Sequence, residues 1–438
     1  MSKHAGIEAR VDGHHLIFQL PLPADECWEL RIDGGSAEDA GAMAIHGGQR
    51  HADGMLVARS ADGGGWRLLD RVRIKVVGHL PHKTGARLRE AAAFMPARTA
   101  RHIMAGIRVL TASFGYGGDI PESRAISSWQ RRLQPLALAR NLVHRAMQER
   151  FEEVWTIGVV QATPGQVMRD GLGAGVRWFE PRDRGYLADP FAVEIDGHLR
   201  VFAEAYDFEG GRKGYLVTGD AEDLAGGGRG ETVLREDHHL SWPQVFEHEG
   251  AWWMLPEACG GGEVRLYRAD PFPHCWTAAA VLLPGFAGAD PTLYRDDTGW
   301  WMFVTDHMNQ DETVLHLYFA DRLEGPWHPH PENPVKADLS SARPAGPLFL
   351  DGDDLVRPAQ DCSHTYGGAV TLNRVIAMTR EHYREEVIAR VEPDAGSAWP
   401  DGVHTFAGVG SLTIVDAKRE FFSWKRWWHG LRQLVRGS

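Results

Sequence analysis

One pattern occurs four times between Asp189 and Asp361. Each copy starts with a strand-like segment led by a proline, passes through a short turn, and ends in a second strand-like segment that closes on a carboxylate. The leading prolines are Pro190, Pro243, Pro291 and Pro344. Their spacings are 53, 48 and 53 residues. Hairpin repeats of about this period are typical of the blades of a β-propeller, which gathers equivalent positions around one axial pocket.

The pattern extends beyond these four copies. A fifth, weaker unit begins at Val403, and the segment from Trp155 reads as a strand. We expect that strand to pair into the last unit and close the ring, because an unpaired edge strand invites association with other chains. The sequence therefore predicts a mainly β protein: a five-bladed β-propeller over residues 151–417, preceded by a small α/β domain over residues 1–122.

Two helical segments are predicted beside the propeller. Residues 123–150 are rich in arginine and keep helical spacing, which predicts a linker helix packed on the propeller. A basic surface for anionic lipid or a phosphorylated substrate is the alternative. Residues 418–438 predict a C-terminal amphipathic helix, with aromatic residues on one stripe and six Lys or Arg between positions 418 and 436. Such a helix suits a membrane interface, and equally a groove on its own domain.

Charge and composition exclude some classes of function. The net charge of −12 argues against a nucleic-acid-binding protein. The four cysteines have no metal-ligand spacing, which suits a reducing compartment. The sequence shows neither a secretion signal nor a long apolar run, so we expect a cytoplasmic protein, peripheral on the inner face of the membrane where residues 418–436 contact it.

Short sequence words carry a resemblance to known families. The words ADPF from Ala188 and ADPT from Ala289 are similar to the blade-one and blade-three signatures of five-bladed glycosidases of families 43 and 32. Residues 155–420 resemble the propeller-like N-terminal region of plant glucosamine inositolphosphorylceramide transferases and their bacterial relatives, through words such as YLADPF, ARPAG and GVHTFAG. We expect no counterpart of the plant enzymes' separate catalytic glycosyltransferase domain.

The glycosidase resemblance implies roles for two aspartates. Asp189 would be the base or nucleophile at the anomeric carbon, and Asp290 would orient the substrate and tune the pKa values of its neighbours. The alternative is turn chemistry, in which an aspartate before proline caps its own backbone. Two aspartates at the same position of two blades favour the site.

Arg343 departs from the glycosidase pattern. In family 43 the fourth blade opens with a glutamate that acts as general acid, whereas this chain has Arg343 there. Hydrolysis needs a proton donor, but a phosphate leaving group needs its charge neutralised, and a guanidinium matches phosphate geometry. Arg343 therefore favours transfer from a phosphate-linked sugar. The alternative is a structural ion pair with Asp290 or Asp361.

Further carboxylates and aromatic residues complete the predicted site. Glu257 ends a strand beside a glycine run, and Asp361 lies in a polar cluster, so either is a candidate for proton transfer. Trp242 is predicted as a stacking face for sugar. The candidate substrate-binding residues are Glu204, Trp242, Asp306, His364, Tyr366 and His404. We predict no firm cofactor or metal site, and a divalent cation on the propeller axis near His404 stays open.

The sequence thus predicts a carbohydrate-active protein. The leading prediction is a glycosyltransferase that uses a nucleotide- or lipid-phosphate-linked sugar to assemble a surface polysaccharide or glycolipid at the cytoplasmic membrane face. The first alternative is a glycoside hydrolase of the family 43/32 type acting on furanosides or small glycosides. The second is a non-catalytic sugar-binding propeller that serves a partner transferase.

Overall fold

The computed structural model describes most of the chain. The described residues are 6–11, 14–19, 26–32, 36–60, 66–78, 80–109, 126–148, 150–173, 175–180, 182, 184–208, 213–310 and 312–423. Over these residues the protein is mainly β, which confirms the predicted class.

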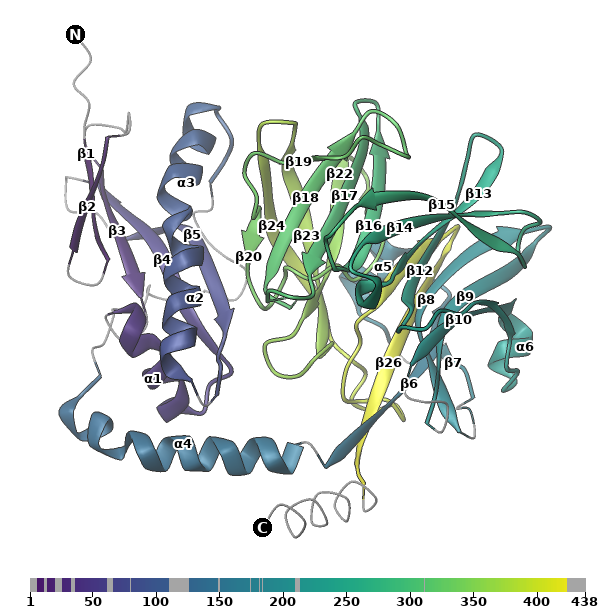
Figure 1. The fold of residues 1–438 in the computed structure, drawn as a ribbon, viewed down its shortest axis with the longest axis horizontal. Coiled ribbons are helices and arrows are strands. Elements are labelled where there is room, and N and C mark those ends of the chain that lie inside the picture. Colours follow the sequence, from purple (N-terminus) through teal and green to yellow (C-terminus); the bar gives the residue numbers. More distant parts are fainter. Residues whose placement is uncertain are drawn as a thin grey trace.

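Five antiparallel sheets form the larger part of the molecule (Figure 1). The first contains β8 (Gly185–Ile195), β9 (His198–Asp207), β10 (Gly214–Asp220) and β11 (Glu231–Leu234). The second contains β12 (Ser241–His248), β13 (Ala251–Glu257), β14 (Val264–Ala269) and β15 (Trp276–Leu283). The third contains β16 (Gly288–Asp296), β17 (Gly299–Asp306), β18 (Val314–Ala320), β19 (His328–Pro329) and β20 (Lys336–Ala337).

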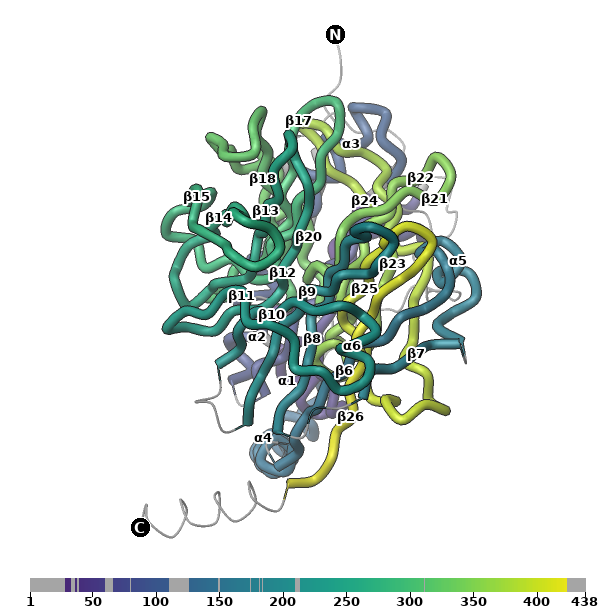
Figure 2. Tube along the Cα trace, turned by 90° about the vertical axis from the view of Figure 1, so that its right-hand side faces the viewer, coloured from purple at the N-terminus to yellow at the C-terminus, as the bar shows by residue number. Residues whose placement is uncertain are grey.

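The fourth and fifth sheets complete this part. The fourth contains β21 (Phe349–Asp351), β22 (Asp354–Asp361), β23 (Ala369–Met378) and β24 (Tyr383–Val391). The fifth contains β25 (Phe406–Val409), β26 (Leu412–Phe422), β6 (Phe151–Val160) and β7 (Val176–Trp178). Short helices α5 (Pro164–Asp170) and α6 (Ala221–Ala225) and the 3₁₀ turn Cys259–Gly261 lie in the connections. In Figure 2 the five sheets lie around a common centre.

The turns within the sheets follow from local chemistry. The β8–β9 turn has Asp196 at φ 50° and Gly197 at φ 77°, and the β12–β13 turn has Glu249 at φ 52° and Gly250 at φ 71°. Two successive positive φ values give the turn whose twist matches an antiparallel hairpin, and glycine adopts them without a steric penalty. These tight turns set the register that brings each pair of strand ends together.

The fifth sheet joins the two ends of the repeated region. Strand β26 pairs with β6 from Thr413 opposite Val160 to Phe422 opposite Phe151. The strand expected at Trp155 therefore pairs into the last unit, as predicted. The segment before β21 also contacts the fifth sheet, since the backbone N–H of Phe406 donates to the carbonyl oxygen of Ala345 at 2.6 Å.

The same pairing corrects the prediction for the C-terminal helix. Residues 418–422 belong to β26, not to a helix. Lys418 is fully buried, and its ammonium group donates to Glu153 and Thr365 at 2.8 and 2.9 Å. Long pairing with β6 outweighs the helical spacing of the aromatic residues. The rest of the predicted helix, residues 424–438, lies outside the described residues.

A separate α/β unit precedes the five sheets. Strands β3 (Glu26–Ile32), β4 (His51–Ser60) and β5 (Arg67–Lys75) form one sheet, and β1 (Gly6–Val11) pairs with β2 (His14–Gln19). The helices are α1 (Ala37–Gly47), α2 (Pro81–Ala93) and α3 (Met95–Met104). This unit meets the third sheet, where Arg73 and Asp338 form a parallel bridge and the shared core includes Val314 and Ala337. The exact domain boundaries stay a prediction.

The predicted arginine-rich helix is α4 (Ser128–Gln148). Arg131 pairs with Asp39, and Arg140 donates to the carbonyl groups of Ile45 and His46. These contacts anchor α4 on α1 of the α/β unit, whereas the sequence predicted packing on the propeller. Figure 1 shows it running along the edge of the molecule from the α/β unit toward β6. Among the described helices, α4 included, none has the length and apolarity needed to cross a membrane.

Candidate active site

Three strained residues open the first three sheets. Asp189, Trp242 and Asp290 have φ values of 49°, 53° and 47°, and each precedes a proline. The ladders of these sheets shift register at the same places. Left-handed backbone is unfavourable for a side chain other than glycine, and costs about 1–3 kcal/mol per residue. Such strain persists where the surrounding structure enforces it, and it is concentrated at functional sites.

Carboxylates of neighbouring sheets hold these strained residues in place. Asp416 Oδ2 accepts a hydrogen bond from the backbone N–H of Asp189 at 3.0 Å, and Asp189 Oδ2 accepts one from that of Trp242 at 3.3 Å. Glu257 Oε2 accepts from the backbone N–H of Asp290 at 2.9 Å. Each bond crosses from one sheet to the next, so the strained strand starts of three sheets meet in one buried network.

Asp189 belongs to a buried carboxylate–imidazole–carboxylate chain. His404 Nε2 lies 3.2 Å from Asp189 Oδ1, and His404 Nδ1 lies 2.7 Å from Asp416 Oδ1. The imidazole stacks on Trp155 with ring centres 3.9 Å apart. Burial lowers the pKa of His404, but the two carboxylates outweigh it and the net shift is upward. Burial raises the pKa of Asp189 to about 6, against the opposing charge of His404. Asp189 can therefore exchange a proton near neutral pH.

Asp290 is held by a guanidinium fork. Arg343 donates to Asp290 through Nε at 2.6 Å and through a terminal nitrogen at 3.2 Å, and Gln360 donates at 2.7 Å. Arg343 also lies 3.5 Å from Glu257 Oε2. Burial raises the pKa of Asp290 to about 7, although Arg343 opposes this, and Glu257 raises it further. The structural ion pair with Asp290, left open by the sequence, is thus present.

Tyr366 lies between the two halves of this centre. Its ring is 5.5 Å from that of His404, and the Arg343 guanidinium lies 5.3 Å from its ring centre. Burial raises its pKa well above the usual value. Glu204 is also buried beside the centre, and its pKa is raised well above the ordinary range by burial and by nearby Asp189. Burial and the neighbouring carboxylates thus both disfavour a negative charge on Glu204.

Four predicted site residues are placed differently from the expectation. Trp242 is fully buried against Phe191, with ring centres 5.1 Å apart, so it presents no stacking face. Asp361 accepts from the backbone N–H of Ser363 at 2.8 Å and pairs with Arg390 at 2.9 Å. Because side chains alternate along a strand, its neighbour Gln360 contacts Asp290 in its place.

Asp306 and His364 also lie apart from the network. Asp306 accepts from the backbone N–H of Met308 at 3.0 Å, which is turn chemistry. In the first two sheets, Glu204 and Glu257 pair with the residue before the strained one. In the third sheet the equivalent position, opposite Ala289, is occupied by Thr305 and not by Asp306. His364 is exposed.

Sequence reasoning missed Asp416, Gln360 and the stacking partner Trp155. Asp416 lies within β26, the second strand of the fifth unit, and accepts a hydrogen bond from the next sheet as Glu257 does. Aligning the fifth unit with the other four would have found it.

Asp189, His404 and Asp416 also form a possible cation-binding group, because their ligand atoms lie within 4.8 Å of one another. The two ring nitrogens of His404 face different carboxylates, however, so a cation could bind only by breaking those hydrogen bonds. The arrangement fits a proton relay better than a metal site. The axial cation stays a prediction.

The raised pKa of Asp290 predicts a pH-dependent stability. Between about pH 4 and 7 this carboxyl is protonated in the folded protein, where its pKa is about 7, and ionised in the unfolded chain, where its pKa has the ordinary value of 3.8. The folded state binds more protons, so the free energy of unfolding falls as pH rises through this window. Denaturant titrations should show a smaller fall for Asp290→Asn than for the parent protein. Asp297→Asn, at an exposed turn, should follow the parent. Parallel curves for the parent and Asp290→Asn would refute the prediction.

Comparison with known proteins gives one family. The model of the family described as "Glucosamine inositolphosphorylceramide transferase 1, N-terminal" matches residues 182–405, just over half of the chain. Glucosamine inositolphosphorylceramide transferase 1 of Oryza sativa subsp. japonica is 36% identical over 220 residues, which cover 47% of this chain and 29% of the relative. The Arabidopsis thaliana protein of the same name is 30% identical over 211 residues, covering 46% and 27%. The match thus spans less than a third of these relatives.

Solved structures give more distant likenesses. A family 117 glycoside hydrolase from the marine bacterium Zobellia galactanivorans has a TM-score of 0.39 at 13% identity, covering 55% of this chain and 88% of that one. The catalytic domain of a family 62 α-L-arabinofuranosidase from Coprinopsis cinerea has a TM-score of 0.38 at 15% identity, covering 54% and 92%. At these scores the likeness carries no argument about the site.

Proposed function

Because this chain belongs to the family of glucosamine inositolphosphorylceramide transferase 1, N-terminal, we propose that it acts on carbohydrate through the buried carboxylate centre. The five sheets are taken as the blades of a five-bladed propeller, and the strained starts of three of them supply the centre. The observation that carries the proposal is the pair Asp189 and Asp290, two buried carboxyl groups with pKa values raised to about 6 and about 7. Groups in this range both accept and donate protons at neutral pH.

The proposed reaction is glycosyl transfer from a phosphate-linked sugar. Asp189 takes the proton of the acceptor hydroxyl, and His404 with Asp416 holds its carboxylate in place. Asp290 positions the sugar. Arg343 Nε lies 2.6 Å from Asp290 Oδ2. When Asp290 is protonated, it no longer neutralises the positive charge of Arg343. The guanidinium then stabilises the negative charge that develops on the leaving phosphate.

Glycoside hydrolysis is the second candidate. One observation favours it. Arg343 stands where a family 43 enzyme has its general acid, but Asp290, with a pKa of about 7, could donate the proton instead. In that reaction Asp290 protonates the leaving alcohol and Asp189 activates water. The two reactions differ in whether the sugar leaves from phosphate or from an alcohol.

The biological setting is proposed on the same basis. We infer assembly of a surface polysaccharide or glycolipid at the cytoplasmic membrane face, since the relatives are named glucosamine inositolphosphorylceramide transferase 1. Mass spectrometry of surface glycans from a deletion strain tests this setting. An unaltered glycan profile would contradict it.

A substrate panel tests the reaction. The purified chain is incubated with nucleotide- and lipid-phosphate-linked sugars, with and without acceptor alcohols, and separately with aryl furanosides. We expect release of nucleotide or lipid phosphate that accelerates with acceptor. Furanoside cleavage without donor turnover would establish the hydrolase. Sugar binding without any turnover would leave the non-catalytic module as the function.

A further inference from the structure

A second cluster of imidazole and carboxylate groups lies where the α/β unit meets the third and fourth sheets. His102 comes from α3, Glu332 from the segment between β19 and β20, and His382 from the turn before β24. His102 Nε2 lies 3.0 Å from Glu332 Oε2, and His382 Nδ1 lies 3.3 Å from Glu332 Oε1. The three ligand atoms lie within 4.8 Å of one another. We propose that this cluster binds a transition-metal dication of the Zn²⁺ class and fastens the α/β unit to the sheets.

The ligand set fits such an ion. Two imidazole nitrogens and one carboxylate oxygen are a common protein set for Zn²⁺, with the fourth position left for water. The side chains of His102 and Glu332 are 0% and 2% exposed, so the ion would be shielded from solvent. The side chain of His382 is 24% exposed and offers a path of entry.

The geometry differs from that around His404. There, one imidazole lies between two carboxylates, and both of its nitrogens are engaged by different groups. At the second cluster, two imidazoles each direct one nitrogen at the same carboxylate. An ion that replaces these two hydrogen bonds can therefore meet all three residues together, without opening a second carboxylate contact.

Neighbouring groups hold the carboxylate and its segment in place. The backbone N–H of Tyr383 donates to Glu332 Oε2 at 3.0 Å. The backbone N–H of Glu332 donates to His330 Nδ1 at 3.1 Å, and His330 Nε2 lies 3.0 Å from the carbonyl oxygen of Thr379. Such outer contacts orient metal ligands. Arg101 Nε also approaches Glu332 Oε1 at 3.5 Å. Its side chain is 46% exposed, so solvent screens this ion pair.

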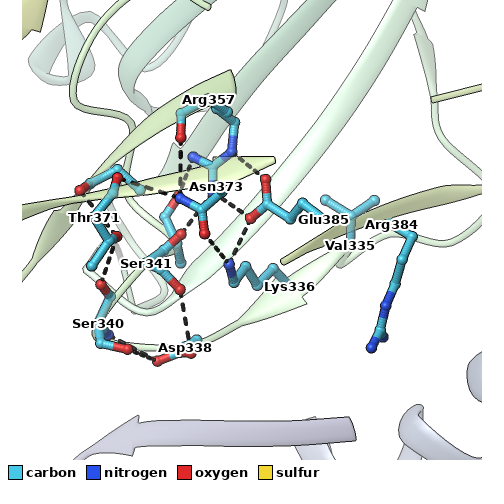
Figure 3. Close-up of polar contacts among 12 residues, drawn as sticks. Val335, Lys336, Asp338, Ser340, Ser341, Arg357, Thr371, Asn373, Arg384 and Glu385 are labelled. Carbon is cyan, nitrogen blue, oxygen red and sulfur yellow. Dashed lines mark hydrogen bonds and ion pairs between the residues drawn. The ribbon is translucent and has the colours of Figure 1, made fainter. Parts of the chain in front are cut away.

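A cavity adjoins the cluster at His102, the one member of the three that lines it, and leaves room for water there. His102 lines this cavity together with Lys336 and Glu385. Figure 3 shows that these charged neighbours satisfy one another: Lys336 donates to Glu385 at 2.6 Å, and Arg357 donates to it at 2.6 and 2.7 Å. In contrast, His102 Nδ1 has no hydrogen-bond partner among the described residues. With Nε2 on a metal, Nδ1 would carry a proton and could donate to water in the cavity.

A metal here would join three segments that are far apart in the sequence. An ion that binds the folded but not the unfolded chain stabilises the fold by mass action. Its effect should be greatest where α3 contacts the segment at Glu332. The site is distinct from the proposed sugar site, so the two proposals fail or succeed independently.

The test uses the full chain stripped with a chelator and dialysed. Co²⁺, which reports tetrahedral ligation through visible absorption, is titrated into the parent protein and into His382→Ala and Glu332→Gln. His328→Ala is the matched control, because His328 is an exposed histidine four residues before Glu332. Hydrogen exchange of α3 is followed with and without Zn²⁺.

We expect one equivalent of Co²⁺ with a tetrahedral spectrum in the parent and in His328→Ala. The affinity should fall by about 100-fold or more in the two cluster variants, since each loses one of only three protein ligands. Zn²⁺ should slow hydrogen exchange of α3 in the parent and in His328→Ala, but not in His382→Ala or Glu332→Gln. Absence of uptake, or uptake unchanged in His382→Ala, would overturn the proposal. Because His382 is partly exposed, its variant separates loss of binding from loss of folding.

Discussion

Replacing Asp189 with asparagine is expected to lower turnover of the sugar substrate by about 10²–10⁴-fold, the usual contribution of a general base. Asparagine has nearly the same shape, and its carbonyl oxygen can still accept from the backbone N–H of Trp242 or from the Thr405 hydroxyl. What the variant loses is the ability to take a proton and the charge that faces His404. The protein should remain folded while the chemical step fails.

The measurement is the turnover rate across the neutral pH range, with circular dichroism to check folding. The parent should lose activity as pH falls through about 6, where Asp189 becomes protonated. Asp196→Asn is the matched control, because Asp196 lies in the exposed turn at the other end of the same hairpin. Equal activity of Asp189→Asn and Asp196→Asn would exclude Asp189 as the base and favour a binding module.

The repeated proline motif was enough to predict the part of the site that lies at the strand starts. Asp189 and Asp290 precede the repeated prolines, and the structure places both in the strained position that one buried network surrounds. The proline spacing thus located the strand starts well. It could not show that residues before proline would adopt positive φ, since that conformation is disfavoured locally and is enforced by bonds from other sheets.

The misplacements came from register and alternation. A shift of one residue along a strand moves a side chain to the opposite face. For this reason Gln360, and not the predicted Asp361, contacts Asp290. In the third sheet Asp306 ends β17 one residue beyond Thr305, and its side chain bonds the following turn. The fifth unit has no leading proline at His404–Thr405, so Asp416 was not recognised as the counterpart of Glu257. Beyond β25, the aromatic spacing favoured a helix, but pairing with β6 made residues 418–422 a strand.

Among the proposed variants, replacing Arg343 with methionine should lower the free energy of unfolding the most. Arg343 is 6% exposed and binds Asp290 with two nitrogens, with Glu257 at 3.5 Å. Removing one partner of a buried ion pair leaves an uncompensated charge and typically costs about 3–5 kcal/mol. Methionine fills much of the volume, so the loss reports mainly the charge.

The loss should also depend on pH in a defined direction. Without Arg343, burial and Glu257 remain to raise the pKa of Asp290, so this carboxyl stays protonated to higher pH than in the parent. A raised folded-state pKa gives stability that is present at low pH and lost as pH rises. Arg343→Met should therefore be least destabilising near pH 5 and most destabilising near pH 9.

A double-mutant cycle gives the decisive comparison. Adding Asp290→Asn to Arg343→Met should recover part of the loss, because Gln360 can still donate to the asparagine and no ionised carboxylate is left at position 290. Arg169→Met serves as the control: Arg169 pairs with Asp351 at 2.8 Å, and the two side chains are 55% and 29% exposed, so its loss should cost about 1 kcal/mol or less. If Arg343→Met and Arg169→Met cost the same, or if the double variant is no more stable than Arg343→Met at alkaline pH, the charge of Asp290 is not what Arg343 compensates. Denaturant midpoints of the four variants and the parent decide between these outcomes.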